Sequence, residues 1–296
     1  MTTFKSVNPK EVSTGAFHQF MLGVVAPRPI AFASTIDSEG NVNLSPFSFF
    51  NAFGSNPPTL IFSPARRVRD NTTKHTLQNV QEIKEVTINI VNYPIVEQMS
   101  LSSTEYDKGV NEFIKSGLTE EPSVMVKPPR VKEAPAAFEC IVKDIIETGQ
   151  EGGAGNLIIC EVVLAHFSET ILDENGKVDT VKADLVGRMG GNWYCRANGD
   201  ALFEVAKPIR NKGIGVDLMP EVIRNSNILT GNNLGKLGNI EQLPDQAEVA
   251  KFRENQEIQA LLKNGQGLEE NLHRLAQKYL ENNQLNEAWL TLLQKV

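Results

Sequence analysis

Apolar and polar residues alternate with a period of two along several short stretches in the first two thirds of the chain. Residues 31–36 alternate in this way, stop at the turn-forming segment 37–40 and resume at 42–45, which predicts a β-hairpin. Further strand patterns occupy residues 59–63, 86–91, 138–146 and 156–167. The last two flank a glycine-rich turn, and they predict a long antiparallel pair.

Helical patterns are local inserts in this β-rich region. Ser13 can cap a helix over residues 15–22, and Asp70 or Asn71 can cap another that runs to about residue 85. The strands are not separated by regular helices, so a doubly wound parallel sheet is disfavoured. The pattern instead predicts a mainly β fold, an antiparallel barrel with peripheral helices.

The pattern changes in the last third of the chain. Residues 207–244 are rich in glycine, asparagine and proline, and they predict an irregular extension. Helical periodicity follows, with Asp245 as the cap of a helix over 247–263 and with a helical hairpin near the end. We therefore expect a first domain over 1–206 and a C-terminal extension over 207–296, whose hairpin packs on the first domain or on a partner subunit.

The composition argues against several kinds of partner. The 296 residues carry 29 Lys and Arg against 36 Asp and Glu, a net charge of −7, whereas a general nucleic-acid binder is basic. No run of about 18 apolar residues could span a membrane, and no secretory pattern is seen, so we expect a cytoplasmic protein without a membrane partner. Cys140, Cys160 and Cys195 are then expected to be free thiols, the first two buried in strands.

Common catalytic templates are missing from the sequence. It has no P-loop, no G-x-S-x-G turn and no H-E-x-x-H pair, and its four histidines and three cysteines show no zinc-binding spacing. We therefore predict no metal site and no catalytic side chain. An enzyme of this kind needs a bound cofactor to supply the chemistry.

A basic cluster stands at the start of the second predicted helix. Arg66, Arg67, Arg69 and Lys74 fall within nine residues, and three threonines lie among or beside them. Guanidinium and ammonium groups, hydroxyls and free helical N–H groups are the donors that a phosphate needs. A solvated basic loop with capping threonines explains the same residues, so the cluster alone leaves both interpretations open.

Residues 41–51 interleave small polar side chains with three phenylalanines. A flat heteroaromatic ring needs this mixture, with apolar faces for stacking and N–H or hydroxyl donors along its edge. A strand with an aromatic core face explains the phenylalanines equally well, but Ser45 and Ser48 are harder to explain as core residues.

The phenylalanines also bear on the oligomeric state. Alternation along a strand places Phe47 and Phe49 on one face and Phe50 on the other. Together with Phe53 they form more aromatic surface than one short strand can bury. The excess needs a cover from the C-terminal helices or from a second subunit, and we expect a homodimer.

Five motifs carry a resemblance to a known family over about residues 12–200. They are Pro27-Arg28-Pro29-Ile30, Ser34-Thr35, Asn43-x-x-Pro46-Phe47-Ser48-Phe49-Phe50, Lys74-x-Thr76-x-x-Asn79 and Arg188-x-Gly190-Gly191-x-x-Tyr194. This string resembles the flavin reductase family, FMN-binding split barrels that include flavoredoxin-like proteins. Many members have aspartate where this chain has His75, so the role of His75 is open.

The resemblance implies a homodimeric antiparallel split barrel with one FMN per subunit near the dimer interface. Residues at the matching positions would line the flavin, namely Ser34, Thr35, Asn43, Ser45, Pro46 and Ser48. A second set would hold the ribityl and phosphate end, namely Ser63, Arg66 or Arg67, Lys74 and Thr76, with His75 as a further candidate contact.

The resemblance further implies an FMN-dependent oxidoreductase of the NAD(P)H:flavin reductase type. Hydride from NADH or NADPH would reach flavin N5, and electrons would leave to a small-molecule or protein acceptor. Two alternatives stay open. One is an electron-transfer flavoprotein that carries FMN without a nicotinamide site, and the other is a cofactor-free interaction module on the same barrel.

Overall fold

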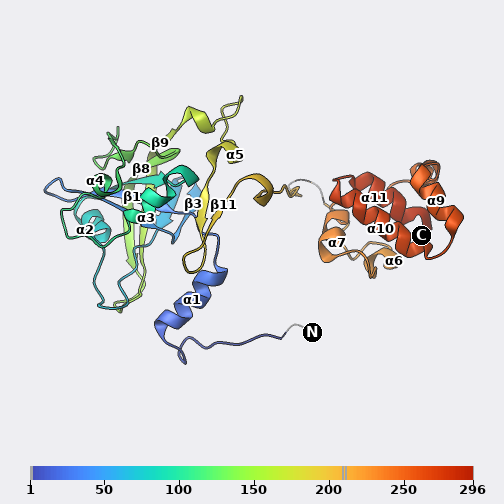
Figure 1. Cartoon of the computed structure of the whole chain (residues 1–296), viewed down its shortest axis with the longest axis horizontal. Helices are drawn as coiled ribbons and strands as arrows, with labels where there is room; N and C mark the ends of the chain where they lie inside the picture. The colour runs from blue at the N-terminus through green and yellow to red at the C-terminus, as the bar shows by residue number, and fades with distance from the viewer. Residues whose placement is uncertain (1–2, 209, 211, 296) are drawn as a thin grey trace. The chain divides into compact units, whose positions relative to one another are not determined.

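The computed structural model describes residues 3–208, 210 and 212–295. Contacts divide the chain into two compact units, Met1–Phe203 and Glu204–Val296. Figure 1 shows a sheet in the first unit and helices in the second. The sequence pattern places the domain boundary after residue 206.

One antiparallel sheet of seven strands forms the body of the first unit. In spatial order its strands are β2 (Val42–Phe47), β1 (Ala31–Ile36), β5 (Glu85–Ile90), β8 (Ala136–Glu147), β9 (Asn156–Phe167), β4 (Pro58–Phe62) and β3 (Phe50–Ser55). Every neighbouring pair is antiparallel. The predicted hairpin, the predicted strands and the long pair β8–β9 are therefore confirmed.

Shorter elements surround this sheet. Two small ladders pair β6 (Glu120–Glu121) with β7 (Arg130–Val131) and β10 (Val186–Arg188) with β11 (Tyr194–Arg196). The helices of the first unit are α1 (Thr14–Val24), α2 (His75–Glu82), α3 (Val96–Leu101), α4 (Glu112–Ser116) and α5 (Thr180–Ala183). Single 3-10 turns lie at Tyr93–Ile95, Glu169–Ile171 and Gly199–Ala201.

Two apolar clusters hold the first unit together, and alternate residues of β1 belong to each. Ala33 joins the cluster that contains Leu77 and Val80 of α2. Phe32, the next residue back, joins the cluster that contains Phe113 of α4. β1 is thus buried on both faces, which fixes α2 and α4 relative to the sheet.

The first helix begins as predicted, and the second does not. Ser13 caps α1 by accepting from the Ala16 N–H at 3.2 Å. At the second helix, Asp70 Oδ1 accepts from both the N–H and the hydroxyl of Thr72, and Asn71 has a left-handed φ of 57°. A residue at positive φ interrupts a right-handed helix, so α2 begins only at His75 and the basic residues before it form a loop.

The second unit is a set of helices with its own core. They are α6 (Glu221–Arg224), α7 (Gly231–Leu237), α8 (Gln246–Phe252), α9 (Gln256–Asn264), α10 (Leu268–Glu281) and α11 (Leu285–Leu292), followed by a 3-10 turn at Leu293–Lys295. Asp245 caps α8 as predicted. The single helix expected over 247–263 is wrong, because Asn255 caps a new helix with its side chain and so divides that segment into α8 and α9.

The segment expected to be irregular supplies part of that core. Met219, Ile223 and Leu237 are buried with Trp289 of α11. Thr230 also forms a capping box that starts α7. The hairpin α10–α11 therefore packs against this segment of its own unit, a partner that the sequence pattern does not anticipate.

The predicted alternation of the phenylalanines is wrong, because β2 ends at Phe47 and β3 begins at Phe50. The chain bends between them, so Phe47 and Phe50 both contact the first cluster, and the Phe47 ring lies 5.5 Å from that of Phe62. Phe49 and Phe53 stay exposed, at 38% and 65%. Of these four phenylalanines, Phe47 is therefore buried and Phe50 partly buried inside the unit, whereas the other two remain at its surface.

The cysteines follow their strand patterns. Cys140 and Cys160 are buried free thiols, and Cys195 is partly exposed. Burial raises the pKa of the Cys140 thiol to about 12. Among the residues that the structure describes, no helix has the length and apolar character needed to cross a membrane.

Candidate functional site

A pocket lies between β2, the first turn of α2 and the loop that follows α3. Six residues of the predicted cofactor set line it, namely Asn43, Ser45, Arg67, Lys74, His75 and Thr76. The rest of the lining comes from residues 103–106 and from Glu112. The fold thus brings the strand residues and the basic loop, some 30 positions apart in sequence, into one site.

Buried polar pairs hold the first turn of α2 on the β1–β2 hairpin. Asn43 Nδ2 donates to Thr76 Oγ1 at 3.0 Å, and Asn79 Nδ2 donates to Thr35 Oγ1 at 3.1 Å. All four side chains are buried, and Thr35 pairs with Asn43 across the hairpin. Each asparagine uses the oxygen of one threonine, so the hydroxyl proton of that threonine remains available for a further acceptor.

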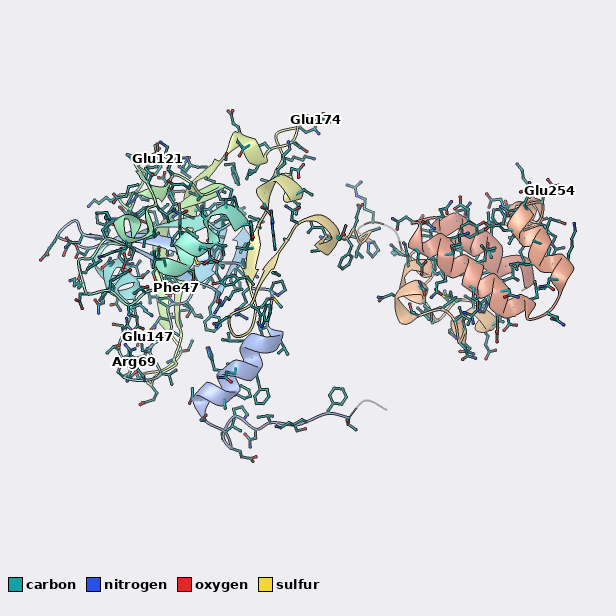
Figure 2. The ribbon with its side chains drawn as sticks, viewed as in Figure 1. Phe47, Arg69, Glu121, Glu147, Glu174 and Glu254 are labelled. Atoms are coloured by element: carbon teal, nitrogen blue, oxygen red, sulfur yellow. The ribbon has the colours of Figure 1, made fainter. Side chains whose placement is uncertain are left out.

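A cluster of positive charge stands at one side of the pocket. Arg67 Nε lies 2.9 Å from Glu105 Oε1, Lys74 Nζ lies 3.4 Å from the same oxygen, and Arg69 contacts the other carboxylate oxygen. Hydrogen bonds from Arg67 and then Arg69 lower the pKa of Glu105 to about 2. Figure 2 shows Arg69 at the same end of the first unit as Glu147, which ends β8.

The chemistry of these donors fits a phosphate monoester. Arg67 and Lys74 supply charge, Thr76 supplies a hydroxyl, and the first turn of α2 has no side-chain cap on its amides. Burial first, and then the charge of Arg67, lowers the pKa of His75. His75 is therefore neutral at neutral pH, and it enters the pocket as a hydrogen-bonding group and not as a further cation.

Arg66 and Arg67 have different positions, although the sequence could not separate them. Arg66 donates to the side-chain and backbone oxygens of Asn71, at 2.7 and 3.0 Å, and so braces the basic loop. Arg67 lines the pocket. Of the two, Arg67 is the one placed to reach a ligand there.

The remaining predicted residues lie beside the pocket or apart from it. Ser48 accepts from Arg28 Nε at 3.3 Å, and Ser63 accepts from the Asn156 N–H at 3.0 Å. Pro46 is half-buried in β2. The hydroxyl of Ser34 is fully buried, has no hydrogen-bond partner among the described residues and does not line the pocket, because alternation along β1 places it on the face opposite to Thr35.

Two acidic residues of the pocket have no place among the sequence-based candidates. Glu105 joins the basic loop from 31 positions beyond Lys74. Glu112 is buried at the start of α4, where one carboxylate oxygen accepts from the Leu44 N–H at 2.9 Å, and burial raises its pKa. The polar run of residues 102–107 between two helices is the only sequence signal for this wall of the pocket.

A second pocket lies at the start of β8 and the end of β9. Arg130, Lys132 and His166 line it. His166 Nε2 lies 2.7 Å from a carboxylate oxygen of Glu139, which is fully buried and also accepts from the Val124 N–H. These contacts tie the loop before β7 to the sheet, and none of the predicted cofactor residues lies among them.

Comparison with known proteins gives one consistent result. A family model described as "flavin reductase like domain" matches residues 24–182. An uncharacterized protein of Aquifex aeolicus is 40% identical over 196 residues, which make up 66% of this chain and 97% of that protein. The family model ends before the helical unit begins.

Solved structures agree with the family model. Nitrilotriacetate monooxygenase component B from Bacillus cereus superposes with a TM-score of 0.65 at 27% identity, over 69% of this chain and all of that one. A protein of Shewanella frigidimarina described as a flavin reductase with split barrel domain gives a TM-score of 0.56 at 27% identity, over 67% and 95% of the two chains. The fold of the first unit is thus that of flavin reductase split barrels.

Proposed function

The chain belongs to the family of flavin reductase like domains, and from this premise we propose that it is an FMN-binding oxidoreductase of the NAD(P)H:flavin reductase type. The observation that carries the proposal is the pocket at the start of α2. There Arg67, Lys74 and Thr76 stand beside Asn43 and Ser45. One side of the site suits a phosphate, and the other presents polar strand residues to the remainder of the ligand.

Each part of the pocket has a distinct task in this proposal. The two cations would hold the phosphate, while Asn43 would orient the Thr76 hydroxyl toward it. Ser45, which lines the pocket, and the hydroxyl proton of Thr35 on the same face of the hairpin would serve the ring edge, where fixed donors favour negative charge. When bound, the isoalloxazine ring supplies the redox chemistry.

FMN is proposed over FAD because the sequence contains one compact basic cluster and no second phosphate cradle. Release of the chromophore by heat, followed by chromatography against standards, tests this choice. The expected chromophore elutes with FMN. An FAD or haem peak would overturn the assignment, and a colourless protein that takes up no added FMN would favour the interaction module.

The electron donor is tested separately on the yellow protein without oxygen. NADH or NADPH should bleach the flavin absorbance at about 450 nm. Bleaching by dithionite but by neither nucleotide would instead identify an electron carrier without a nicotinamide site.

We also propose a homodimer, because α1 and the β10–β11 hairpin expose several large apolar side chains. No residue of α1 is buried, and Figure 1 shows this helix standing out from the sheet. Four of its apolar residues or neighbours are exposed, namely Phe20, Met21, Val24 and Val25. Trp193, between β10 and β11, is 78% exposed. Apolar surface of this extent is unusual on a monomer.

Arg28 makes these two elements one rigid surface. Its guanidinium donates to the carbonyls of Leu22 and Val25 at the end of α1, at 2.9 and 2.6 Å, and to that of Met189 before the hairpin tip at 2.8 Å. α1 itself contains no Lys, Arg, Asp or Glu, although the Lys5 ammonium lies 5.7 Å from the centre of the Phe20 ring, so the helix offers a mainly apolar face to a partner. A second copy, related by a twofold axis, supplies an equally apolar face.

Sedimentation at micromolar concentration tests the dimer. The wild type should sediment as a dimer and Val24→Asp as a monomer, whereas Val181→Asp, at another exposed valine, should remain dimeric. A monomeric wild type would refute the proposal.

A further inference from the structure

The carboxylate of Glu105 lies among three cations of the basic cluster, where a bound anion would also lie. Its carboxylate contacts Arg67, Arg69 and Lys74, all three of which come from the loop before α2. Glu105 itself belongs to the loop between α3 and α4. The ion pairs therefore join two separate segments, and nothing in the local chain of the basic loop requires a carboxylate there.

We propose that Glu105 is a built-in anion that competes with the phosphate of FMN for these cations, and that this competition makes the flavin readily exchangeable. The inference rests on the proposed function, because it assigns the phosphate to this cluster. It concerns the exchange of the cofactor, which the presence of a flavin site does not by itself determine.

The phosphate and Glu105 compete because they would use the same donor groups. Arg67 Nε and Lys74 Nζ both point to one oxygen of Glu105, at 2.9 and 3.4 Å. A phosphate on the same donors would place its oxygens where the carboxylate oxygens now lie. Two anions at that separation repel each other, so the phosphate and the Glu105 carboxylate exclude one another.

The loop is built so that the side chain of Glu105 can leave while the backbone stays. Glu112 anchors α4 to the Leu44 N–H of β2, and the Lys115 ammonium lies 5.5 Å from the ring centre of Tyr106. Between these anchored positions and α3, the Glu105 side chain is 36% exposed. Rotation into solvent is enough to vacate the position.

Arg67 keeps its place when Glu105 leaves. Its Nη1 donates to the Thr72 hydroxyl at 2.9 Å and to the Thr73 carbonyl at 2.7 Å. These bonds hold the guanidinium independently of Glu105, and its side chain is only 16% exposed. The Arg67 guanidinium can therefore pair with Glu105 or with a phosphate in the same orientation, and Glu105 is not needed to orient it.

A direct consequence distinguishes ligands with and without a phosphate. Glu105 lowers the affinity for FMN, because three ion pairs must break before the phosphate binds. Riboflavin has no phosphate and meets no such competition. A protein with this arrangement releases FMN more easily than one whose cations are unpaired, which suits an enzyme that passes flavin on more than a carrier that retains it.

The test compares Glu105→Gln with a matched control. Glutamine keeps the size of the side chain and removes its charge. Asp107→Asn removes the same charge two residues away, from a carboxylate with no hydrogen bond or ion pair to the cluster among the described contacts. The charge of Asp107 acts on His75 by raising its pKa, so its removal leaves His75 neutral as before. Affinities for FMN, riboflavin and inorganic phosphate are measured by titration on the full chain freed of flavin, and the rate of FMN release is measured by dilution.

Glu105→Gln should bind FMN about tenfold more tightly and release it about tenfold more slowly, which is the combined effect expected of three partly exposed ion pairs. The affinity of Glu105→Gln for riboflavin should change by less than about twofold. The affinities of Asp107→Asn for FMN and for riboflavin should also change by less than about twofold. Unchanged or weaker FMN binding by Glu105→Gln would overturn the proposal, as would equal tightening for both flavins.

The inorganic phosphate titration separates this inference from the proposed function. Tighter phosphate binding by Glu105→Gln, in a protein that binds neither flavin, would refute the flavin function and leave only the anion competition. If the protein binds flavin and Glu105→Gln changes neither flavin nor phosphate affinity, the anion competition is refuted and the flavin function stands.

Discussion

Replacement of Lys74 by alanine tests the phosphate site with the least disturbance of the fold. The Lys74 ammonium contacts Glu105 at 3.4 Å, and its side chain does not cap α2. Arg67 is less suitable, because it also holds the loop through Thr72 and Thr73. Thr76 is buried and bonded to Asn43, so its removal would disturb the packing of α2.

The size of the effect follows from one charge-assisted bond. Loss of such a bond costs about 1.5–3 kcal/mol, which corresponds to FMN binding that is about ten- to a hundredfold weaker. Glu105 partly neutralises Lys74 in the wild type. The loss of FMN affinity caused by Lys74→Ala should therefore be larger in the Glu105→Gln background than in the wild type. The two substitutions are therefore expected to be non-additive.

Quenching of flavin fluorescence gives the affinities, with riboflavin as the control ligand. Riboflavin should bind the wild type and Lys74→Ala within about twofold of each other, since the missing bond is to the phosphate. An equal loss for both flavins would show that Lys74 acts through the fold, and the assignment of the phosphate to this cluster would be wrong.

Three further outcomes are expected. A thiol reagent at mildly alkaline pH should label Cys195 alone in the native protein, and rapid labelling of all three cysteines would contradict the burial of Cys140 and Cys160. Burial raises the pKa of Glu112, so the free energy of unfolding should fall as pH rises from the ordinary carboxyl range through that raised pKa. In thermal melts, the melting temperature of Glu112→Gln should fall less over this pH range than that of the wild type. An equal fall in both proteins would refute this prediction. Finally, a chain ending at Phe203 should fold and bind FMN like the full chain, since the apolar clusters of its unit contain no residue beyond 203, and failure to fold would show that the helical unit is required.

The sheet was predictable because its signal is local. Alternation within residues 31–36 and 42–45 suffices to define a hairpin with one register, and the same holds for the long pair β8–β9. The start of α2 was not predictable in this way. Asp70 has the chemistry of a helix cap, but here it bonds to Thr72 within a turn, and only the left-handed conformation of Asn71 separates the two outcomes.

The same distinction between local and distant sequence signals applies to the residues of the candidate site. Motif resemblance could indicate Asn43, Lys74 and Thr76, because each belongs to a short string of residues, and the pocket brings all three together. Glu105 belongs to no such string, and its role depends on contacts with residues 31 to 38 positions away. The same limit applies to Met219 and Ile223, whose irregular surroundings give no hint that they pack on Trp289.

Charge balance among the three cations that contact Glu105 shows how one carboxylate could control the affinity for FMN. Arg67, Arg69 and Lys74 carry three positive charges, and Asp70, which pairs with Arg69, cancels one of them. The remaining two match the charge of about −1.5 to −2 on a phosphate monoester at neutral pH. Glu105 cancels another when it is bound to the cluster, and the neutral His75 restores none. If the phosphate of FMN binds these cations as proposed, their charge matches it only when the Glu105 carboxylate has turned away, and the affinity for FMN then depends on the cost of that movement.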